Sequence, residues 1–414
     1  MKFSPSPACG RGGRGERAAG DRTALLETPP IPQSRSLSTE RIEVTDPSQS
    51  PAHSGFGRFF LPGPTEVHPD VLAAMTRPLI GHRGAEMSSL LEACDPVLRS
   101  LFRTRRPVYV ASSSATGLME GAVRNGVRRR ALSLVNGAFS ERFAALVTDC
   151  GREGERYEVP MGEANQPDEV YRRLRAGGFD AVTVVHSETS TGVLNPLTEI
   201  AEAVRRAEGE TGDEILLLVD GVTTVGGMLV EAEAWGLDFL LTGSQKAMAL
   251  PPGLAFGTAS ERMMARAATI PGRGQYFDLL EYDAYWRKHQ TPNTPAVSLM
   301  YALAEQCRRI GAEGVEARAG RHWRMAERTW EWAQSRPGLA LYAAEGQRSP
   351  TVTTIRVDEG MPASRICSEM TARGWTLGTG YGKLKDLTFR IGHMGDHTMD
   401  ELDALLAALE EVLG

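Results

Sequence analysis

Short apolar runs alternate with longer amphipathic stretches along most of the chain. The apolar runs predict buried strands at 108–111, 131–135, 181–186, 215–220 and 239–241. The periodicity between them predicts helices, such as those at 117–127 and 200–208. Buried apolar strands separated by helices are typical of a mainly parallel sheet that is covered on both faces. We therefore predict an α/β fold.

The pattern changes after about residue 311. Long charged helices are predicted at 315–334 and 399–413, with a strand at 352–357 between them. This arrangement predicts a large domain over residues 56–310 and a smaller α+β C-terminal domain over residues 311–414.

Residues 1–55 differ from the rest of the chain. They are rich in Gly, Pro, Ser and Arg and show no apolar periodicity. Such a segment buries too little apolar surface to offset its conformational entropy, so we expect a disordered N-terminal extension without a function of its own. Acidic residues lie among its arginines and it has no apolar core, which argues against a transit or signal peptide.

Composition narrows the function classes. The chain has 414 residues and a formal net charge of −6, which argues against a general nucleic-acid binder. No apolar run reaches the ~18–20 residues of a membrane span. The five cysteines form no C-x-x-C pair, which disfavours zinc, iron–sulfur and disulfide frameworks. We expect a soluble cytoplasmic protein with reduced thiols and no metal.

Polar residues gather where the predicted strands end. Asp220 ends one strand, and Lys246 follows another in a Thr-Gly-Ser-Gln-Lys run. The strand at 108–111 leads into the small residues 112–117 and a helix, an arrangement that presents backbone N–H groups to a phosphate. Each feature alone has a commoner explanation as a cap, a turn or a solvated lysine. Together, at the strand ends where ligands bind in such sheets, they indicate a pyridoxal-phosphate site.

A family resemblance supports this interpretation. The stretch Thr-Gly-Ser-Gln-Lys-Ala-Met-Ala-Leu-Pro-Pro-Gly at 242–253 closely resembles the lysine motif of class V aminotransferases of the alanine–glyoxylate and serine–pyruvate type. Further motifs resemble the same family in the same order, at 61–65, 81–86, 136–142, 186–192, 290–295 and 389–395. The resemblance extends from about Phe59 to the C-terminus. It implies a fold-type I pyridoxal-phosphate enzyme with a mainly parallel seven-stranded sheet between helices.

The resemblance also implies roles for the matched residues. Lys246 would carry pyridoxal 5′-phosphate as a Schiff base and then move a proton at the substrate α-carbon. Asp220 would pair with the pyridine nitrogen, and Arg390 would hold the substrate carboxylate. The remaining matches are Ser114, Ala115, Thr116 and Gln245 at the phosphate, Phe139 stacked on the ring, Thr189 at the ring hydroxyl, Thr294 at the phosphate of the other subunit, and Gly63 and Arg83 on the substrate side. A homodimer with shared active sites follows from the position of Thr294.

Several matched positions depart from the family pattern. Phe139 stands where relatives usually have Trp, and Ala115 and Thr116 stand where the mammalian-type enzyme has Gly and His. Thr291 replaces a Tyr that contacts the phosphate from the neighbouring subunit. His82, His186 and His393 lie near the motifs without metal-ligand spacing, so we expect hydrogen-bonded structural roles for them.

These observations predict a transaminase that moves an amino group from alanine or serine to glyoxylate or pyruvate. A phosphoserine transaminase is an alternative, because His82-Arg83 resembles a phosphate-holding pair, although residues 380–385 lack the second Gly-His-Arg of those enzymes. A pyridoxal-phosphate lyase or desulfurase is another, but Cys307 and Cys367 fall in helical patterns rather than in a mobile loop. A dehydrogenase is disfavoured, because it would need a G-x-G-x-x-G run after a strand and none of the predicted strands is followed by one. A non-catalytic binding module is disfavoured because the lysine, the aspartate and the arginine are all present.

Overall fold

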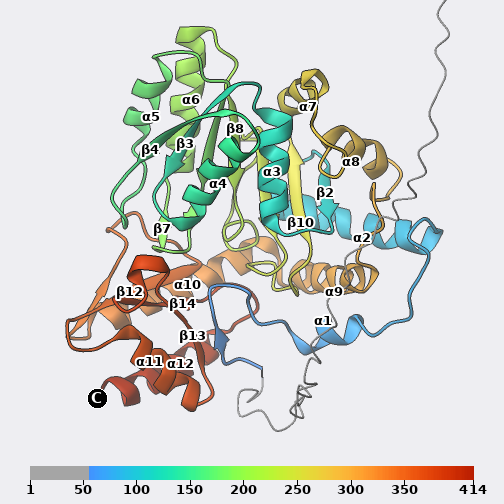
Figure 1. Ribbon diagram of the computed structural model, residues 1–414. Coiled ribbons are helices and arrows are strands. Elements are labelled where there is room, and N and C mark those ends of the chain that lie inside the picture. Colours follow the sequence, from blue (N-terminus) through green and yellow to red (C-terminus); the bar gives the residue numbers. More distant parts are fainter. Residues whose placement is uncertain (1–55) are drawn as a thin grey trace, which may run out of the picture. The chain divides into compact units, whose positions relative to one another are not determined.

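The computed structural model describes residues 56–414, and the disorder predicted for residues 1–55 lies outside this range. Two mixed sheets organise the described chain (Figure 1). The described residues belong to one compact unit, so the domain boundary at 310/311 stays a prediction.

The larger sheet has seven strands in the order β2-β10-β9-β8-β5-β3-β4. Neighbouring strands run parallel except at β10, which is antiparallel to both β2 and β9. The strands are β2 (Val108–Ala111), β3 (Arg130–Val135), β4 (Glu153–Glu158), β5 (Ala181–Val185), β8 (Leu216–Asp220), β9 (Phe239–Gly243) and β10 (Ala255–Ala259). The mainly parallel seven-stranded sheet expected from the sequence is confirmed.

Helices cover both faces of this sheet (Figure 1). Side chains alternate along each strand, so Leu217 and Val219 enter one core while Leu216 and Leu218 enter the other. The first core contains α2 (Ala85–Phe102), α5 (Pro167–Leu174), α6 (Leu197–Thr211) and α9 (Val297–Glu313). The second contains α3 (Ala115–Gly126), α4 (Ala138–Asp149), α7 (Glu261–Thr269) and α8 (Leu279–Trp286).

The smaller sheet has five strands in the order β1-β13-β14-β12-β11. Its strands are β1 (Phe59–Phe60), β11 (Leu339–Leu341), β12 (Val352–Val357), β13 (Thr376–Thr379) and β14 (Thr388–Gly392). It packs in a third core with α10 (Val315–Gln334), α11 (Ala363–Ala372) and α12 (Met399–Leu413). The remaining elements are α1 (Pro69–Ala74), the hairpin of β6 (Ser187–Glu188) and β7 (Val193–Leu194), and the short 3₁₀ helix η2 (Gly382–Leu384). β1 brings the beginning of the described chain into the C-terminal sheet, where it pairs in parallel with β13.

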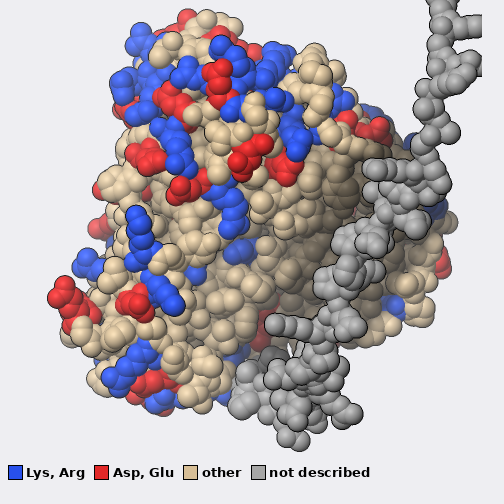
Figure 2. Space-filling model, viewed as in Figure 1, with Lys and Arg blue, Asp and Glu red and all other residues tan. Residues whose placement is uncertain are grey.

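Four predicted elements, β2, β12, α10 and α12, have the expected bounds, and the others differ by one to three residues at an end. The helix α3 is an informative case. This helix begins at Ala115 rather than Gly117, so Ser114 is its N-cap. Figure 2 shows acidic and basic side chains intermixed over the face in view, as expected for a chain of weakly negative net charge. Over residues 56–414 no helix is both long and apolar enough to cross a membrane.

Gly392 yields a stability prediction. A Cβ at this position would lie 2.6 Å from the Cα of Pro62 and 2.7 Å from the carbonyl oxygen of Leu61. We expect Gly392→Ala to lower the free energy of unfolding by about 1–3 kcal/mol, because overpacking forces the backbone to shift. The control Gly209→Ala, in α6 with open space around the added methyl group, is expected to raise it by about 0.5–1 kcal/mol. Chemical denaturation measures both; equal midpoints for Gly392→Ala and wild type would contradict the prediction.

Candidate active site

The polar residues predicted from the strand ends meet at the carboxyl edge of the large sheet. Asp220 is the last residue of β8, and Lys246 lies three residues beyond the end of β9. The positive charge of Lys246 lowers the pKa of Asp220, and the negative charge of Asp220 raises that of Lys246. A Cβ on Gly243 would lie 3.2 Å from the Cβ of Ala115 and 2.7 Å from the Oε1 of Gln245. The predicted phosphate turn therefore adjoins the lysine turn.

The Lys246 side chain is buried beneath the beginning of the described chain. Its amine donates a hydrogen bond to the carbonyl of Pro62, 184 residues earlier, and lies 5.8 Å from the centre of the Phe139 ring. A Cβ on Gly63 would fall 2.3 Å from the lysine Nζ, and the φ of 109° at this position also favours glycine. Thr65 secures the contact, because its amide donates to Gln245 and its hydroxyl to the Lys246 carbonyl, both at 2.9 Å.

Burial changes the protonation of both central groups. It lowers the pKa of Lys246 to about 8, and the positive charge of Arg390 acts in the same direction. Burial also raises the pKa of Asp220 to about 7, against a hydrogen bond of 2.7 Å from the amide of Val222. An amine with a pKa near 8 has a substantial neutral fraction at physiological pH, so it can act as a nucleophile or a base.

Arg390 reaches the same place from the small sheet. Its Nε donates to the carbonyl of Thr379 at 2.9 Å and its Nη1 to that of Thr189 at 3.0 Å. These bonds orient the guanidinium, and burial lowers its pKa from the usual arginine value. The Tyr381 ring lies 5.9 Å from the Cζ of Arg390 and 5.5 Å from the Phe139 ring. The two aromatic rings therefore form a chain of contacts between the Arg390 guanidinium and the Lys246 amine, which contacts Phe139.

The turn after β2 has the donors that a phosphate needs. Ser114 caps α3 without a side-chain cap bond, and the first amides of a helix have no partners within it. The neighbouring Ser112 is fixed by two contacts: its carbonyl accepts from the Tyr276 hydroxyl, and its Oγ accepts from the amide of Ala296, both at 2.9 Å. The first turn of α3, which includes Ala115 and Thr116, therefore has the geometry that the sequence predicted for an anion site.

Three predicted residues lie elsewhere or contribute differently. Thr189 is buried, but its carbonyl rather than its hydroxyl contacts Arg390. Thr294 is exposed, with its hydroxyl 3.5 Å from His82. Arg83 donates to the carbonyls of Thr291 and Pro292 in its own chain. No contact in residues 56–414 joins Thr294 or Arg83 to Lys246, so their roles in binding stay predictions.

Sequence reasoning missed four contributors. They are the Pro62 carbonyl, Glu188, Tyr381 and Arg142, whose guanidinium lies 5.0 Å from the Phe139 ring. Only Glu188 carried a usable signal, because it lies two residues beyond a predicted buried strand and a buried carboxylate there needs partners. Two of the histidines near the motifs, His186 and His393, are buried and each bonds a threonine hydroxyl, at 3.1 and 2.9 Å, which is consistent with structural roles.

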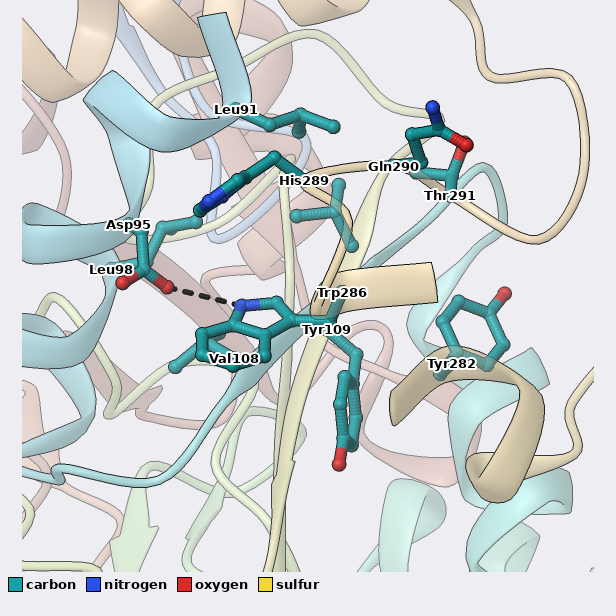
Figure 3. A pocket seen from close by; sticks show the side chains of 11 residues that line it. Leu91, Asp95, Leu98, Val108, Tyr109, Tyr282, Trp286, His289, Gln290 and Thr291 are labelled. Atoms are coloured by element: carbon teal, nitrogen blue, oxygen red, sulfur yellow. Dashed lines mark hydrogen bonds between the residues drawn. The ribbon is translucent and has the colours of Figure 1, made fainter. Parts of the chain in front are cut away.

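A separate cavity lies between α2, β2 and α8 (Figure 3). Trp286 faces Asp95 across it and donates a hydrogen bond of 3.1 Å. The interior measures about 30 Å³, which holds about one or two waters. This cavity is too small for an amino acid, so it does not compete with the Lys246 cluster as the substrate site.

Comparisons with known proteins agree with this geometry. The family described as aminotransferase class-V matches residues 156–381. The chain is 34% identical to the L-aspartate–glyoxylate aminotransferase of Paracoccus denitrificans, over 82% of this chain and 86% of that protein. It is 32% identical to the serine–glyoxylate aminotransferase of Methylorubrum extorquens, over 85% and 89%. The solved structure of an alanine–glyoxylate aminotransferase from Nostoc sp. matches with a TM-score of 0.81 and 29% identity, over 89% of this chain and 97% of that one.

The burial of Lys246 gives a pH prediction. With a pKa of about 8, the reactive neutral amine predominates above pH 8 rather than above the ~10.4 of a free lysine. In cofactor-free protein, acylation of Lys246 by an N-hydroxysuccinimide ester should therefore rise with pH through a midpoint near 8. Peptide mass spectrometry after short pulses at several pH values measures this rate. A midpoint at the free-lysine value would show that the amine is solvated.

Proposed function

This chain belongs to the class-V aminotransferase family, and from that premise we propose that it moves an amino group from alanine or serine to glyoxylate or pyruvate. Its fold-type I architecture is the one expected for the family. The observation that carries the proposal is the buried Lys246 amine, which lies beside Asp220 and over the Phe139 ring. Relatives that differ in amino donor share glyoxylate in their names, which favours glyoxylate as the acceptor.

We assign pyridoxal 5′-phosphate to this site because the donor set fits it. The first turn of α3 offers amides to a phosphate, with Ser114, Ala115, Thr116 and Gln245 around it. Asp220 supplies a buried carboxylate, Phe139 a flat apolar ring and Lys246 an amine. When bound, the cofactor supplies an electron sink for the substrate α-carbon.

The chain's own groups would then divide the work. The Lys246 amine would take a proton from the substrate α-carbon and deliver it to the C4′ carbon of the cofactor, which its lowered pKa favours. The Asp220 carboxylate holds a proton at the pyridine nitrogen. Arg390, with two donors committed to carbonyls, binds the substrate carboxylate through its remaining edge. Phe139 and Tyr381 shield the reacting atoms from water.

One observation favours a second candidate, a donor with an anionic side chain. Arg142 is exposed, and its positive charge lowers the pKa of both Asp220 and Lys246. Within the described chain its guanidinium forms no ion pair, and its one contact is with the Phe139 ring. Phosphoserine or aspartate would suit such a cation. Arg83 supports this candidate less, because its guanidinium already donates hydrogen bonds to two backbone carbonyls. A desulfurase has no comparable support, since Cys307 and Cys367 are buried in α9 and α11.

The proposed function is tested first by trapping the lysine. The protein loaded with pyridoxal phosphate should lose its visible absorbance band when alanine is added, because the amino group passes to the cofactor. Borohydride added before alanine should fix the cofactor on Lys246, as seen by peptide mapping. Lys246→Ala should lose both signals, whereas Lys288→Ala, away from the site, should keep them. Label on another lysine would overturn the assignment.

A donor panel separates the two candidates. We expect kcat/KM with glyoxylate to be highest for alanine or serine, and Arg142→Gln to change it less than about 3-fold. If the donor is anionic, aspartate or phosphoserine will instead lead, and Arg142→Gln will reduce that preference by about 10-fold or more, the size of a lost charge-assisted contact. Arg83→Gln is the matched control, because it removes an arginine whose guanidinium already donates to the carbonyls of Thr291 and Pro292 and to the Gln290 side chain.

Assembly gives a further prediction. If Thr294 reaches the phosphate of another subunit, the protein is a two-fold homodimer with shared sites. Sedimentation at assay concentration should show a dimer, and Thr294→Val should raise the dissociation constant of pyridoxal phosphate. A fully active monomer, or unchanged cofactor affinity in Thr294→Val, would contradict this arrangement.

A further inference from the structure

Glu188 is a buried carboxylate in the active site that the proposed chemistry does not use. It is the last residue of β6, three residues beyond the end of β5, and its side chain has no exposed surface. Within residues 56–414 it forms no ion pair with any Lys or Arg. A buried charge without a countercharge is costly unless hydrogen bonds stabilise it.

The carboxylate is stabilised by five hydrogen bonds. Its Oε2 accepts from the amide of Phe139 at 3.0 Å and from the amide and hydroxyl of Ser140 at 2.9 and 3.1 Å. Its Oε1 accepts from the amide and hydroxyl of Ser190 at 3.1 and 2.6 Å. The Ser190 hydroxyl also accepts from the amide of Ala138 at 3.1 Å. Glu188 and Ser190 thus occupy the first three amides of α4, where the helix dipole favours an anion.

The sequence of α4 leaves room for this arrangement. The N-cap of α4 is Gly137, where serine or aspartate would ordinarily supply the capping oxygen. A Cβ on Gly137 would lie 2.4 Å from the Cγ of Glu188 and 2.5 Å from the Oγ of Ser190. The Glu188 carboxylate therefore occupies the space of an N-cap side chain and accepts hydrogen bonds from the first turn of α4. Phe139 is the second residue of α4, so these hydrogen bonds determine the position of its ring.

The charge of Glu188 also reaches the reacting groups. It raises the pKa of Lys246, of Asp220 and of Arg390. The next residue, Thr189, gives its carbonyl to Arg390 at 3.0 Å. One short segment thus contacts the helix of the ring-stacking Phe139 and the arginine that binds substrate.

We propose that Glu188 is a positioning residue of the transamination: its carboxylate fixes Phe139 through the first turn of α4 and supplies the negative charge that balances Lys246 and Arg390. It touches neither substrate nor cofactor. The proposal rests on the proposed function, because Phe139 has a ring to support only when the cofactor is bound. A purely structural cap would stabilise the fold by the same bonds, so the test needs a measurement that stability alone does not change.

Three variants separate position, charge and stability. Glu188→Gln keeps the shape and removes the charge, Glu188→Asp keeps the charge and shortens the reach, and Ser190→Ala removes the Oγ bonds at 2.6 and 3.1 Å while the charge remains. Each is loaded with pyridoxal phosphate, and its visible absorbance is titrated against pH. The visible circular dichroism, which reports a cofactor held in one asymmetric pose, and kcat and KM for alanine are measured in parallel.

We expect the absorbance midpoint of Glu188→Gln to fall by about one pH unit, because removing a nearby anion disfavours the protonated lysine linkage. Ser190→Ala should keep the wild-type midpoint. Glu188→Asp should also keep the midpoint but lose part of the visible circular dichroism, with kcat reduced more than KM is raised. If Glu188→Gln does not fold, Glu188→Asp still tests the positioning role.

A wild-type midpoint in Glu188→Gln, an equal shift in Ser190→Ala, or wild-type circular dichroism and kcat in Glu188→Asp would each overturn the inference. If the wild-type protein showed no lysine-linked absorbance, the proposed function would fail together with this inference. A normal wild-type spectrum that Glu188 variants leave unchanged would overturn the inference alone.

Discussion

The burial of one amine is the constraint on which the rest of this structure depends. Lys246 has to be dry enough to lose its proton easily, yet it sits in a turn at the edge of a sheet, where solvent would normally reach it. The segment at 59–65 solves this by lying across the turn. Its Pro62 carbonyl accepts from the amine, and its Gly63 leaves space for the lysine side chain. That segment is in turn anchored in the small sheet through β1, so the site needs both sheets.

A second link between the sheets explains how Arg390 is oriented. The chain after β5 carries Thr189, whose carbonyl accepts from Arg390 of β14. On the same segment the hydroxyl of Ser187 donates to that of Ser349 at 2.8 Å, and the amide of Leu194 donates to Gln347 at 2.8 Å. These polar contacts are directional, so they specify one relative placement of the two sheets rather than a loose apolar contact. The position of Arg390 against Lys246 follows from that placement.

Sequence patterns predicted the parts whose cause is local. Apolar periodicity gave β2, β12, α10 and α12 with the bounds that the structure shows, and strand ends marked Asp220 and Lys246. It placed the start of α3 two residues late, because Ala115 and Thr116 suit a turn as well as a helix. Three features arise from contacts between distant segments: the antiparallel direction of β10, the contact of the Tyr381 ring with Phe139, and the hydrogen bonds of Glu188 to the first turn of α4. No periodicity or local preference encodes such contacts.

The antiparallel pairing of β9 and β10 has a consequence for the order of folding. The turn with Lys246 is closed by neighbours: Gly243 pairs with Ala255, and Ser244 exchanges bonds with Pro251 and Leu254 at 2.8 and 3.1 Å. Hairpins of this kind close within about 1–10 μs, whereas pairings between distant segments form more slowly. The strand β1, however, waits for β13, which is synthesised close to the end of the chain. We therefore expect the turn that holds Lys246 to form early during synthesis, and the segment at 59–65 to pack over Lys246 only later, when β1 pairs with β13.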